Sequence, residues 1–165
     1  MKRQQRFRSF AGLCLLGLAT SAFAACGISG GGASISFGGY NPLSFQGKLV
    51  SSNLDSNGTV GVSCNGLVQG VSYTLKLGSG RSNNIAARHL AGSDGGSDLA
   101  YNLYTDAGRS LIWGDGSTGS VLSGSLGAGT SSNSHTFYGR IPGGQNSVPP
   151  GSFSDQLVIT LEYAP

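Results

Sequence analysis

The residue types that bind metals are few in this chain and widely separated. The two histidines, His89 and His135, lie far apart in the sequence. A zinc site needs three or four ligands, so we expect structural or solvated roles for both. The stretch Asp94-Gly-Gly-Ser-Asp98 superficially resembles a calcium loop. Because it lacks the alternating oxygen ligands and the distal glutamate of an EF-hand, we predict an ordinary surface loop there. The sequence predicts neither a metal nor a cofactor.

Residues for acid–base or nucleophilic catalysis do not form a recognisable set either. Serines are abundant, but nothing in the sequence selects a Ser/His/Asp triad. Glu162, the sole glutamate, falls on the polar face of the last predicted strand, so a glycosidase with paired carboxylates is unsupported. Gly78-Ser-Gly80-Arg81 has no Lys-Ser/Thr after it, as a phosphate-binding loop would. We predict no catalytic residues and a protein that is not an enzyme.

The first 24 residues have the features of a secretory signal peptide. Four basic residues between Lys2 and Arg8 precede the short apolar run Phe10–Thr20, and Ala22-Phe23-Ala24 is a small-x-small cleavage site. The apolar run is too short, and its flanks are wrong, for a transmembrane helix. We expect residues 1–24 to be removed, a mature domain at 25–165 with no membrane span, and export to the periplasm and then to the cell surface or medium.

Removing the leader changes the charge and cysteine arguments. Six basic residues then face seven acidic ones, a net charge of −1, which gives no basic patch for nucleic acid. Cys26 and Cys64 remain as one pair, which predicts a disulfide in an exported protein. An alternative is that Phe23-Ala24-Ala25-Cys26 is a lipoprotein cleavage box, with Cys26 lipidated and Cys64 unpaired.

Short runs of alternating apolar and polar residues, bounded by Gly, Ser, Asn or Asp, predict an all-β sandwich or barrel. No convincing amphipathic helix is visible; Ile85–Leu90 is the nearest candidate. Glycine-rich or polar stretches at 27–32, 90–98 and 116–134 are predicted loops, the last with a weak strand near Val121–Leu126. The expected strands are Ala33–Phe37, Phe45–Val50, Thr59–Cys64, Val71–Leu77, Leu99–Thr105, Leu111–Trp113, His135–Ile141 and a last strand from Phe153 to Tyr163.

The last strand has the strictest alternation in the chain. Leu157, Ile159, Leu161 and Tyr163 fall on one face, and the chain ends two residues later. An apolar strand of this kind needs a partner for its free edge, since an exposed apolar edge predicts aggregation. The sequence after it contains none.

Four blocks, in this order, resemble the spore coat protein U domain family, which includes subunits of archaic chaperone–usher pili. Each block is a weak indication alone, but together with the signal peptide and the cysteine pair they cover nearly all of the mature chain. They are Ile35-Ser-Phe37-Gly-Gly-Tyr40-Asn-Pro42-Leu43; Val60-Gly-Val62-Ser-Cys64; Tyr101-Asn-Leu-Tyr104-Thr-Asp106-Ala-Gly-Arg109 running on to Trp113-Gly-Asp115-Gly116; and Tyr138-Gly-Arg-Ile-Pro142 through Gly144-Gln145 and Pro150-Gly151-Ser-Phe-Ser-Asp155 to the final strand.

The resemblance implies an immunoglobulin-like sandwich that lacks its seventh strand. A strand from a neighbouring pilin subunit would fill the gap by β-strand addition. A periplasmic pilus chaperone would hold the groove before assembly at an outer-membrane usher. The residues expected to line this donor-strand groove are Ile35, Phe37, Leu157, Ile159, Leu161 and Tyr163.

The resemblance also bears on the place of the subunit in a fibre. Cys26 is the second residue after the predicted cut, so no extension is expected that could serve as a donor strand. This implies a tip or initiating subunit in adhesion and biofilm formation, although tip adhesins of the family usually resemble two such domains in series. The alternative is a self-complete secreted sandwich that binds a glycan or surface polymer. Tyr73, Tyr101 and Trp113 could form a sugar-binding face, but each lies in an apolar run and is expected in the core.

Overall fold

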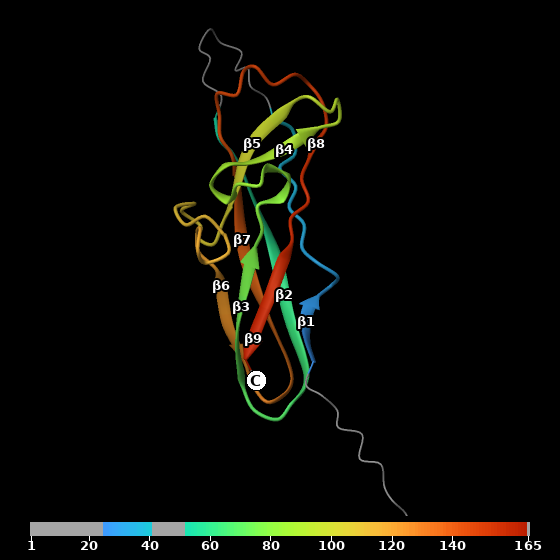
Figure 1. Cartoon of the computed structure of the whole chain (residues 1–165), viewed down its shortest axis with the longest axis vertical. Coiled ribbons are helices and arrows are strands. Elements are labelled where there is room, and N and C mark those ends of the chain that lie inside the picture. The colour runs from blue at the N-terminus through green and yellow to red at the C-terminus, as the bar shows by residue number, and fades with distance from the viewer. Residues whose placement is uncertain (1–24, 41–51, 165) are drawn as a thin grey trace, which may run out of the picture.

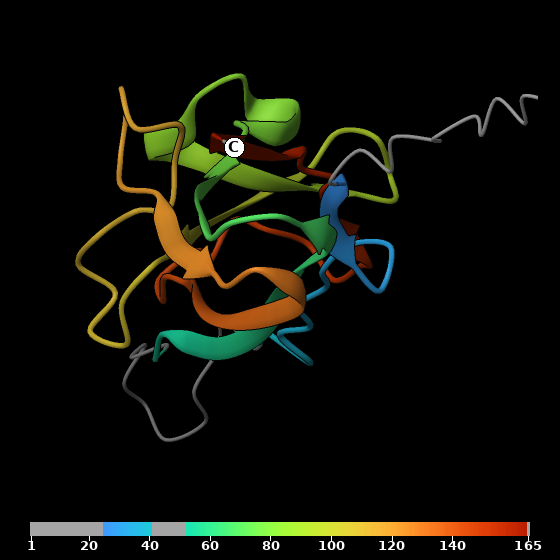
Figure 2. The same ribbon diagram turned by 90° about the horizontal axis from the view of Figure 1, so that it is seen from below.

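The chain folds into two antiparallel sheets that face each other as layers (Figures 1 and 2). The structure is a computed structural model that describes residues 25–40 and 52–164. The predicted signal peptide and the predicted strand Phe45–Val50 lie outside the described residues. Among those that are described, the elements are β1 (Ala25–Ser29), β2 (Leu54–Leu67), β3 (Val71–Leu77), η1 (Gly80–Ser82), η2 (Ile85–Ala87), β4 (Arg88–Gly92), β5 (Asp98–Tyr104), β6 (Leu122–Leu126), β7 (Gly129–Ile141), β8 (Phe153–Ser154) and β9 (Ile159–Ala164).

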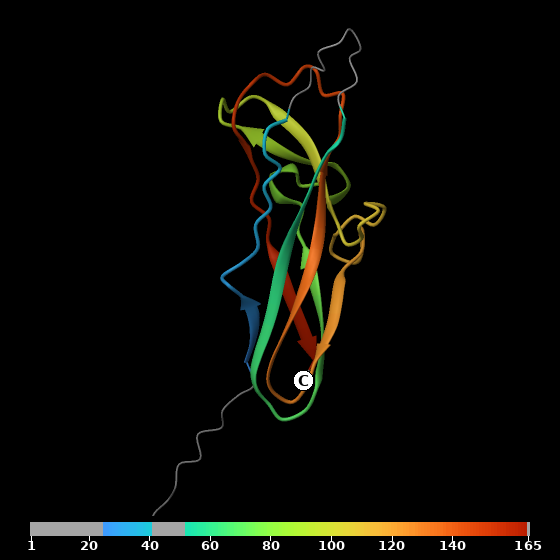
Figure 3. The same ribbon diagram turned by 180° about the vertical axis from the view of Figure 1, so that it is seen from behind.

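The larger sheet has the strand order β1-β2-β7-β5-β4-β8, and the smaller has the order β6-β3-β9. The long pair β2 and β7 forms the back of the sandwich (Figure 3), in register from Leu54 opposite Ile141 to Leu67 opposite Gly129. In the smaller sheet, β9 pairs with β3 alone, with Leu77 opposite Ile159 and Tyr73 opposite Tyr163. The predictions of an all-β class and a sandwich are therefore confirmed.

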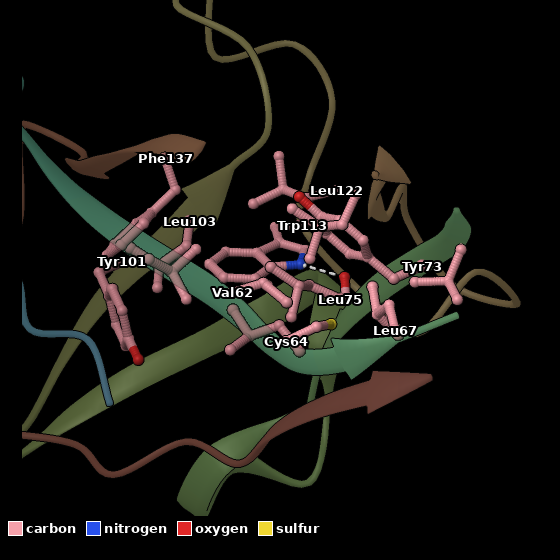
Figure 4. Close-up of a cluster of buried hydrophobic side chains, with 14 of the residues drawn as sticks. Val62, Cys64, Leu67, Tyr73, Leu75, Tyr101, Leu103, Trp113, Leu122 and Phe137 are labelled. Atoms are coloured by element: carbon pink, nitrogen blue, oxygen red, sulfur yellow. Dashed lines mark hydrogen bonds between the residues drawn. The ribbon is translucent and has the colours of Figure 1, made fainter. Parts of the chain in front are cut away.

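The core forms where the alternating faces of the two sheets meet. In β3, Val71, Tyr73, Leu75 and Leu77 are buried while the residues between them face outward, as the period of a strand requires. Trp113 is 1% exposed and donates its indole N–H to the Leu75 carbonyl at 2.9 Å (Figure 4). A buried indole N–H needs such a partner. Tyr73, Tyr101 and Trp113 thus belong to the core, as expected, and form no sugar-binding face.

Several predicted elements differ from those found. Parts of β1 and β4 and the first part of β7 fall within predicted loops, because pairing with the long strand β2 or with β5 satisfies the backbone of these stretches. The segment 33–37, a predicted strand, has no ladder. Its backbone approaches β2 closely at one point, where the Ser34 carbonyl lies 2.7 Å from the place a Cβ on Gly58 would occupy. Leu111–Trp113 contributes only isolated bridges, and Ile85–Leu90 is one 3₁₀ turn followed by β4.

The predicted last strand is two strands. β8 pairs with β4 of the larger sheet, residues 155–158 cross between the sheets, and β9 pairs with β3 of the smaller sheet. The ladder with β3 ends where Gly78 donates its N–H to the Val158 carbonyl. Arg88 donates to the Leu77 and Gly78 carbonyls, so these acceptors are not open to a longer strand.

Candidate functional site: a hollow between the sheets

A hollow of about 1850 Å³ opens between the two sheets on the side where β9 has no partner strand. One wall is the segment 31–40, which follows β1 and climbs beside β2 (blue to cyan in Figure 3). The other wall is the segment 146–159, which contains β8 and the crossing to β9. The floor consists of side chains of the buried core, namely Leu77, Leu99, Tyr101, Leu103, Trp113, Phe137 and Ile141.

The wall 31–40 depends on a glycine in β7. Ile35 and Phe37 lie against Gly139, where an added Cβ would be 2.6 Å from the tip of each side chain. Phe37 also meets the ring of Tyr101 edge-on, with ring centroids 6.1 Å apart. A larger residue at 139 would push both side chains away from the sheet. The first wall is therefore held by packing rather than by a ladder.

At the upper part of the hollow, the Gln145 side chain makes the backbone hydrogen bonds that a neighbouring strand would otherwise make. Gln145 accepts from the Ala100 N–H at 2.7 Å and donates to the Ala100 carbonyl at 3.0 Å, completing the hydrogen bonds of β5 at that residue. Tyr40 donates to the Pro142 carbonyl and accepts from the Gln145 N–H. These contacts join the first and fourth family blocks and fix the loop that leads to β8.

Asp155 anchors the crossing segment in the second wall. Its Oδ2 accepts from the Tyr101 hydroxyl at 2.8 Å, and its Oδ1 accepts from the backbone N–H groups of Arg81 at 3.1 Å and Gln156 at 2.8 Å. Burial, together with this hydrogen bond, raises the pKa of Tyr101 far above its usual range, so the phenol stays a donor. The carboxylate lies against Gly80, which has a φ of +63° and no Cβ to obstruct it.

A buried arginine supports the same region from behind. Arg88 is 1% exposed and donates to the Gly78 carbonyl through Nε and Nη2 and to Asn102 Oδ1 through Nη1 at 2.7 Å. Asn102 in turn donates to the carbonyls of Ile85 and Ala86. Burial lowers the pKa of Arg88, with opposing contributions from Tyr101 and Asp155. A guanidinium remains protonated in such a setting, so this network holds a positive charge behind the hollow.

The structure brings together four of the six residues expected to line a groove. Ile35, Phe37, Leu157 and Ile159 line the hollow. Leu161 packs on the core below it, and Tyr163, 39% exposed, lies further along β9 opposite Tyr73. The hollow thus lies beside the crossing and the first residue of β9 rather than along the whole strand. That a donor strand fills it stays a prediction.

Asp155, Gln145 and Arg88 were not predicted as site residues. For Asp155 a signal existed, since it has the same parity as Leu157 and Ile159 and so places a charge on the apolar face of the predicted strand. Gln145 bonds to the backbone of Ala100, 45 residues before it, and Arg88 to carbonyls 10 and 11 residues before it. Nothing in their local pattern identifies those partners.

The other expected residues have structural roles. Cys26 and Cys64 are register partners on β1 and β2 and form the predicted disulfide. His135 shares a hydrogen bond of 2.7 Å with the Tyr73 hydroxyl, and burial lowers its pKa. Asp94 accepts from the N–H groups of Gly96 and Ser97, and so closes its own turn. In the part of the chain that is described, no group of three His, Cys, Asp or Glu residues could hold a metal ion.

Comparison with known proteins decides the family. The model of the Spore Coat Protein U domain matches residues 14–160. The chain belongs to the spore coat protein U domain family. It is also 32% identical over 142 residues to Protein U of Myxococcus xanthus, a match that covers 83% of this chain and 75% of that protein.

Family membership gives a coarse functional class. Members are exported structural proteins of coats and pili rather than enzymes, and the disulfide is consistent with a location outside the cytoplasm. Within the described residues, no helix has the length and hydrophobicity to cross a membrane.

Proposed function

We propose that this chain is a subunit of a chaperone–usher surface fibre that receives a β-strand from another polypeptide in the hollow between its sheets. The observation that carries the proposal is the position of the hollow. It lies beside the unpaired edge at the start of β9 and opens directly onto buried core side chains such as Leu103 and Trp113. An incoming strand would therefore gain backbone hydrogen bonds and apolar burial together.

The backbone of the second wall has the right polarity for strand addition. The Val158 carbonyl accepts from the N–H of Gly78, the residue that directly follows β3. Since successive residues of a strand present their N–H and C=O groups to opposite edges, Leu157 and Ile159 present theirs to the hollow. The side chains of these two residues also line the hollow. An added strand would pair with them and bury its own alternate side chains beside them.

The energetic balance indicates how many side chains such a strand must insert. Burial of one large aliphatic side chain contributes about 1.5–3 kcal/mol. Four inserted side chains would contribute about 6–12 kcal/mol, and association costs about 4–15 kcal/mol in lost motional freedom. Backbone hydrogen bonds along the edge add to the favourable side. Stable capture therefore requires several inserted side chains, which favours an extended strand over a single anchoring residue.

Neighbouring residues 158 and 159 provide a matched test. Both residues belong to the second wall, but Ile159→Asp places a charge on a side chain that packs against the core, whereas Val158→Asp places the same charge on a side chain that is 71% exposed. We expect Ile159→Asp to abolish co-purification with a co-expressed periplasmic chaperone and surface display, and Val158→Asp to retain both. Circular dichroism would establish that both variants fold. Normal display of a folded Ile159→Asp variant would refute the proposal.

The place of the subunit in a fibre depends on its mature N-terminus. We propose a tip or initiating position in adhesion and biofilm formation, because cleavage after Ala24 leaves a single residue ahead of Cys26. The family match begins at residue 14, inside the predicted leader. Mass spectrometry of the exported protein distinguishes the cases: a chain that starts at Ala25 agrees with a tip position, and one that retains residues 14–24 contradicts it.

A further inference from the structure

The hollow contains one charged group among its apolar side chains. Of the described residues that line it, only Asp155 carries a charge. Asp155 lies between two apolar sections of the second wall, with Phe153 on one side and Leu157 and Ile159 on the other. A strand laid along this wall would therefore meet apolar, acidic and again apolar surface in succession.

The carboxylate of Asp155 is fixed but not saturated. It accepts three hydrogen bonds, one from the Tyr101 hydroxyl and two from the backbone N–H groups of Arg81 and Gln156. An ionised carboxylate offers about four acceptor sites. These three donors come from β5, from η1 and from the crossing segment itself, so the group is held rigidly and can accept one more bond.

No cation is paired directly with this carboxylate in the described part of the chain. Arg88 interacts with it only by long-range electrostatic attraction, because the guanidinium donates its hydrogen bonds to Asn102 and to the carbonyls of Leu77 and Gly78. Arg88 is also 1% exposed, so it is not available to a strand in the hollow. The Tyr101 hydroxyl already donates its proton to Asp155. The free capacity at this point is therefore acceptor capacity alone.

We propose that Asp155 is a specificity subsite, which selects an incoming strand with an amine, hydroxyl or amide side chain at one inward position between apolar ones. This inference rests on the proposed function. A donor group at that position would fill the remaining acceptor site of the Asp155 carboxylate. A lysine would also add electrostatic attraction between its ammonium group and the carboxylate in a partly desolvated site. A glutamate at the same position meets like charge and leaves both carboxylates short of donors. The preferred partner is thus an alternating apolar strand with one interior hydrogen-bond donor.

The test uses synthetic eleven-residue peptides with valine at inward and threonine at outward positions. In successive peptides, one inward valine is replaced by lysine or by glutamate, and binding to the folded protein is followed by fluorescence anisotropy. We expect lysine to be preferred over glutamate by about tenfold or more at one inward position only. High salt should reduce this preference.

The variant Asp155→Asn keeps an acceptor oxygen but removes the charge, and should abolish the preference. Asp94→Asn is the matched control, since Asp94 also accepts local N–H groups but does not line the hollow. An equal affinity for lysine and glutamate peptides at every position, or a preference that persists in Asp155→Asn, would overturn the subsite. If Asp155→Asn does not fold, the unaltered protein provides the test. A preference for lysine over glutamate that does not depend on salt would then overturn the subsite. If no peptide binds, including the one without substitution, the proposed function itself fails.

Discussion

Replacement of Arg88 by methionine tests whether the hydrogen bonds of a buried charge stabilise this fold. The guanidinium donates to the Leu77 carbonyl at 3.3 Å and to the Gly78 carbonyl at 2.6 Å and 3.0 Å. Methionine is similar in length but donates to neither carbonyl. Each buried acceptor left without a donor costs about 1–3 kcal/mol. Asn102 Oδ1 still accepts from the Leu103 N–H, so its loss is smaller.

An opposing effect reduces this loss. Burial of a charge is costly, and removal of Arg88 relieves that cost, as the lowered pKa of Arg88 implies. We expect the two orphaned carbonyls to dominate, with a net decrease of about 3 kcal/mol in the free energy of unfolding. The decrease should also loosen the start of β9, because Gly78 bonds to Val158 directly next to the Arg88 contacts.

Urea unfolding followed by Trp113 fluorescence measures the effect, since Trp113 is the sole tryptophan and is buried. Equal slopes against urea in both proteins would show that the shift in midpoint is a change in stability. Arg81→Met is the control, because the Arg81 side chain is exposed, and it should change the stability by less than about 0.5 kcal/mol. A loss below about 1 kcal/mol for Arg88→Met would refute the argument that the carbonyls depend on this side chain.

Three further predictions concern the disulfide, the first wall and a surface ion pair. Replacing Cys26 and Cys64 by alanine opens a loop with a sequence separation of 38 residues. It should lower the free energy of unfolding by about 4 kcal/mol; equal urea midpoints would contradict this. Gly139→Ala should cost about 1–3 kcal/mol in thermal unfolding by overpacking, whereas Gly127→Ala, with open space around it, should cost less than about 0.5. The hydrogen bond from Arg140 lowers the pKa of Asp55 below 3.8, so its contribution is present above pH 3.8 and is lost as the pH falls through the lower folded value. Melting temperatures of wild type and Asp55→Asn should therefore differ at pH 6 and converge in acid, and a constant difference would contradict the assignment.

Local alternation was sufficient to predict the strands that have one buried and one solvated face. β3 has the predicted bounds Val71–Leu77, β5 differs from the predicted strand by one residue at each end, and β6 by one residue at its start. In each, apolar residues of one parity pack on the core, and most residues of the other parity are at least partly exposed; Asn102 in β5 is the exception, since it is buried. This regularity reflects the pleat of a strand and needs no knowledge of the partner.

Strands whose existence depends on a distant partner could not be predicted in this way. Residues 129–134 are polar throughout, and they form the start of β7 because β2 is long enough to pair with them. The opposite case is residues 33–37, which alternate well but form no ladder, although β1 pairs only with Gly61–Asn65 of the neighbouring β2. Alternation reports which side of a segment is apolar. It does not report whether a neighbouring backbone is within hydrogen-bonding distance.

The hollow could not be predicted from local alternation for the same reason. Its shape depends on a segment that pairs first with β4 in one sheet and then with β3 in the other. From sequence alone, Phe153 to Tyr163 is one strand, and a free edge along its whole length follows. In the structure, Arg88 occupies the Leu77 and Gly78 carbonyls and Asp155 holds the chain towards Tyr101, so the strand divides into β8 and β9. The division places Asp155 inside the hollow instead of on a continuous apolar edge. Under the proposed function, Asp155 would both shape the end of the β9 ladder and select the incoming strand, so that stability and partner choice would depend on a shared residue.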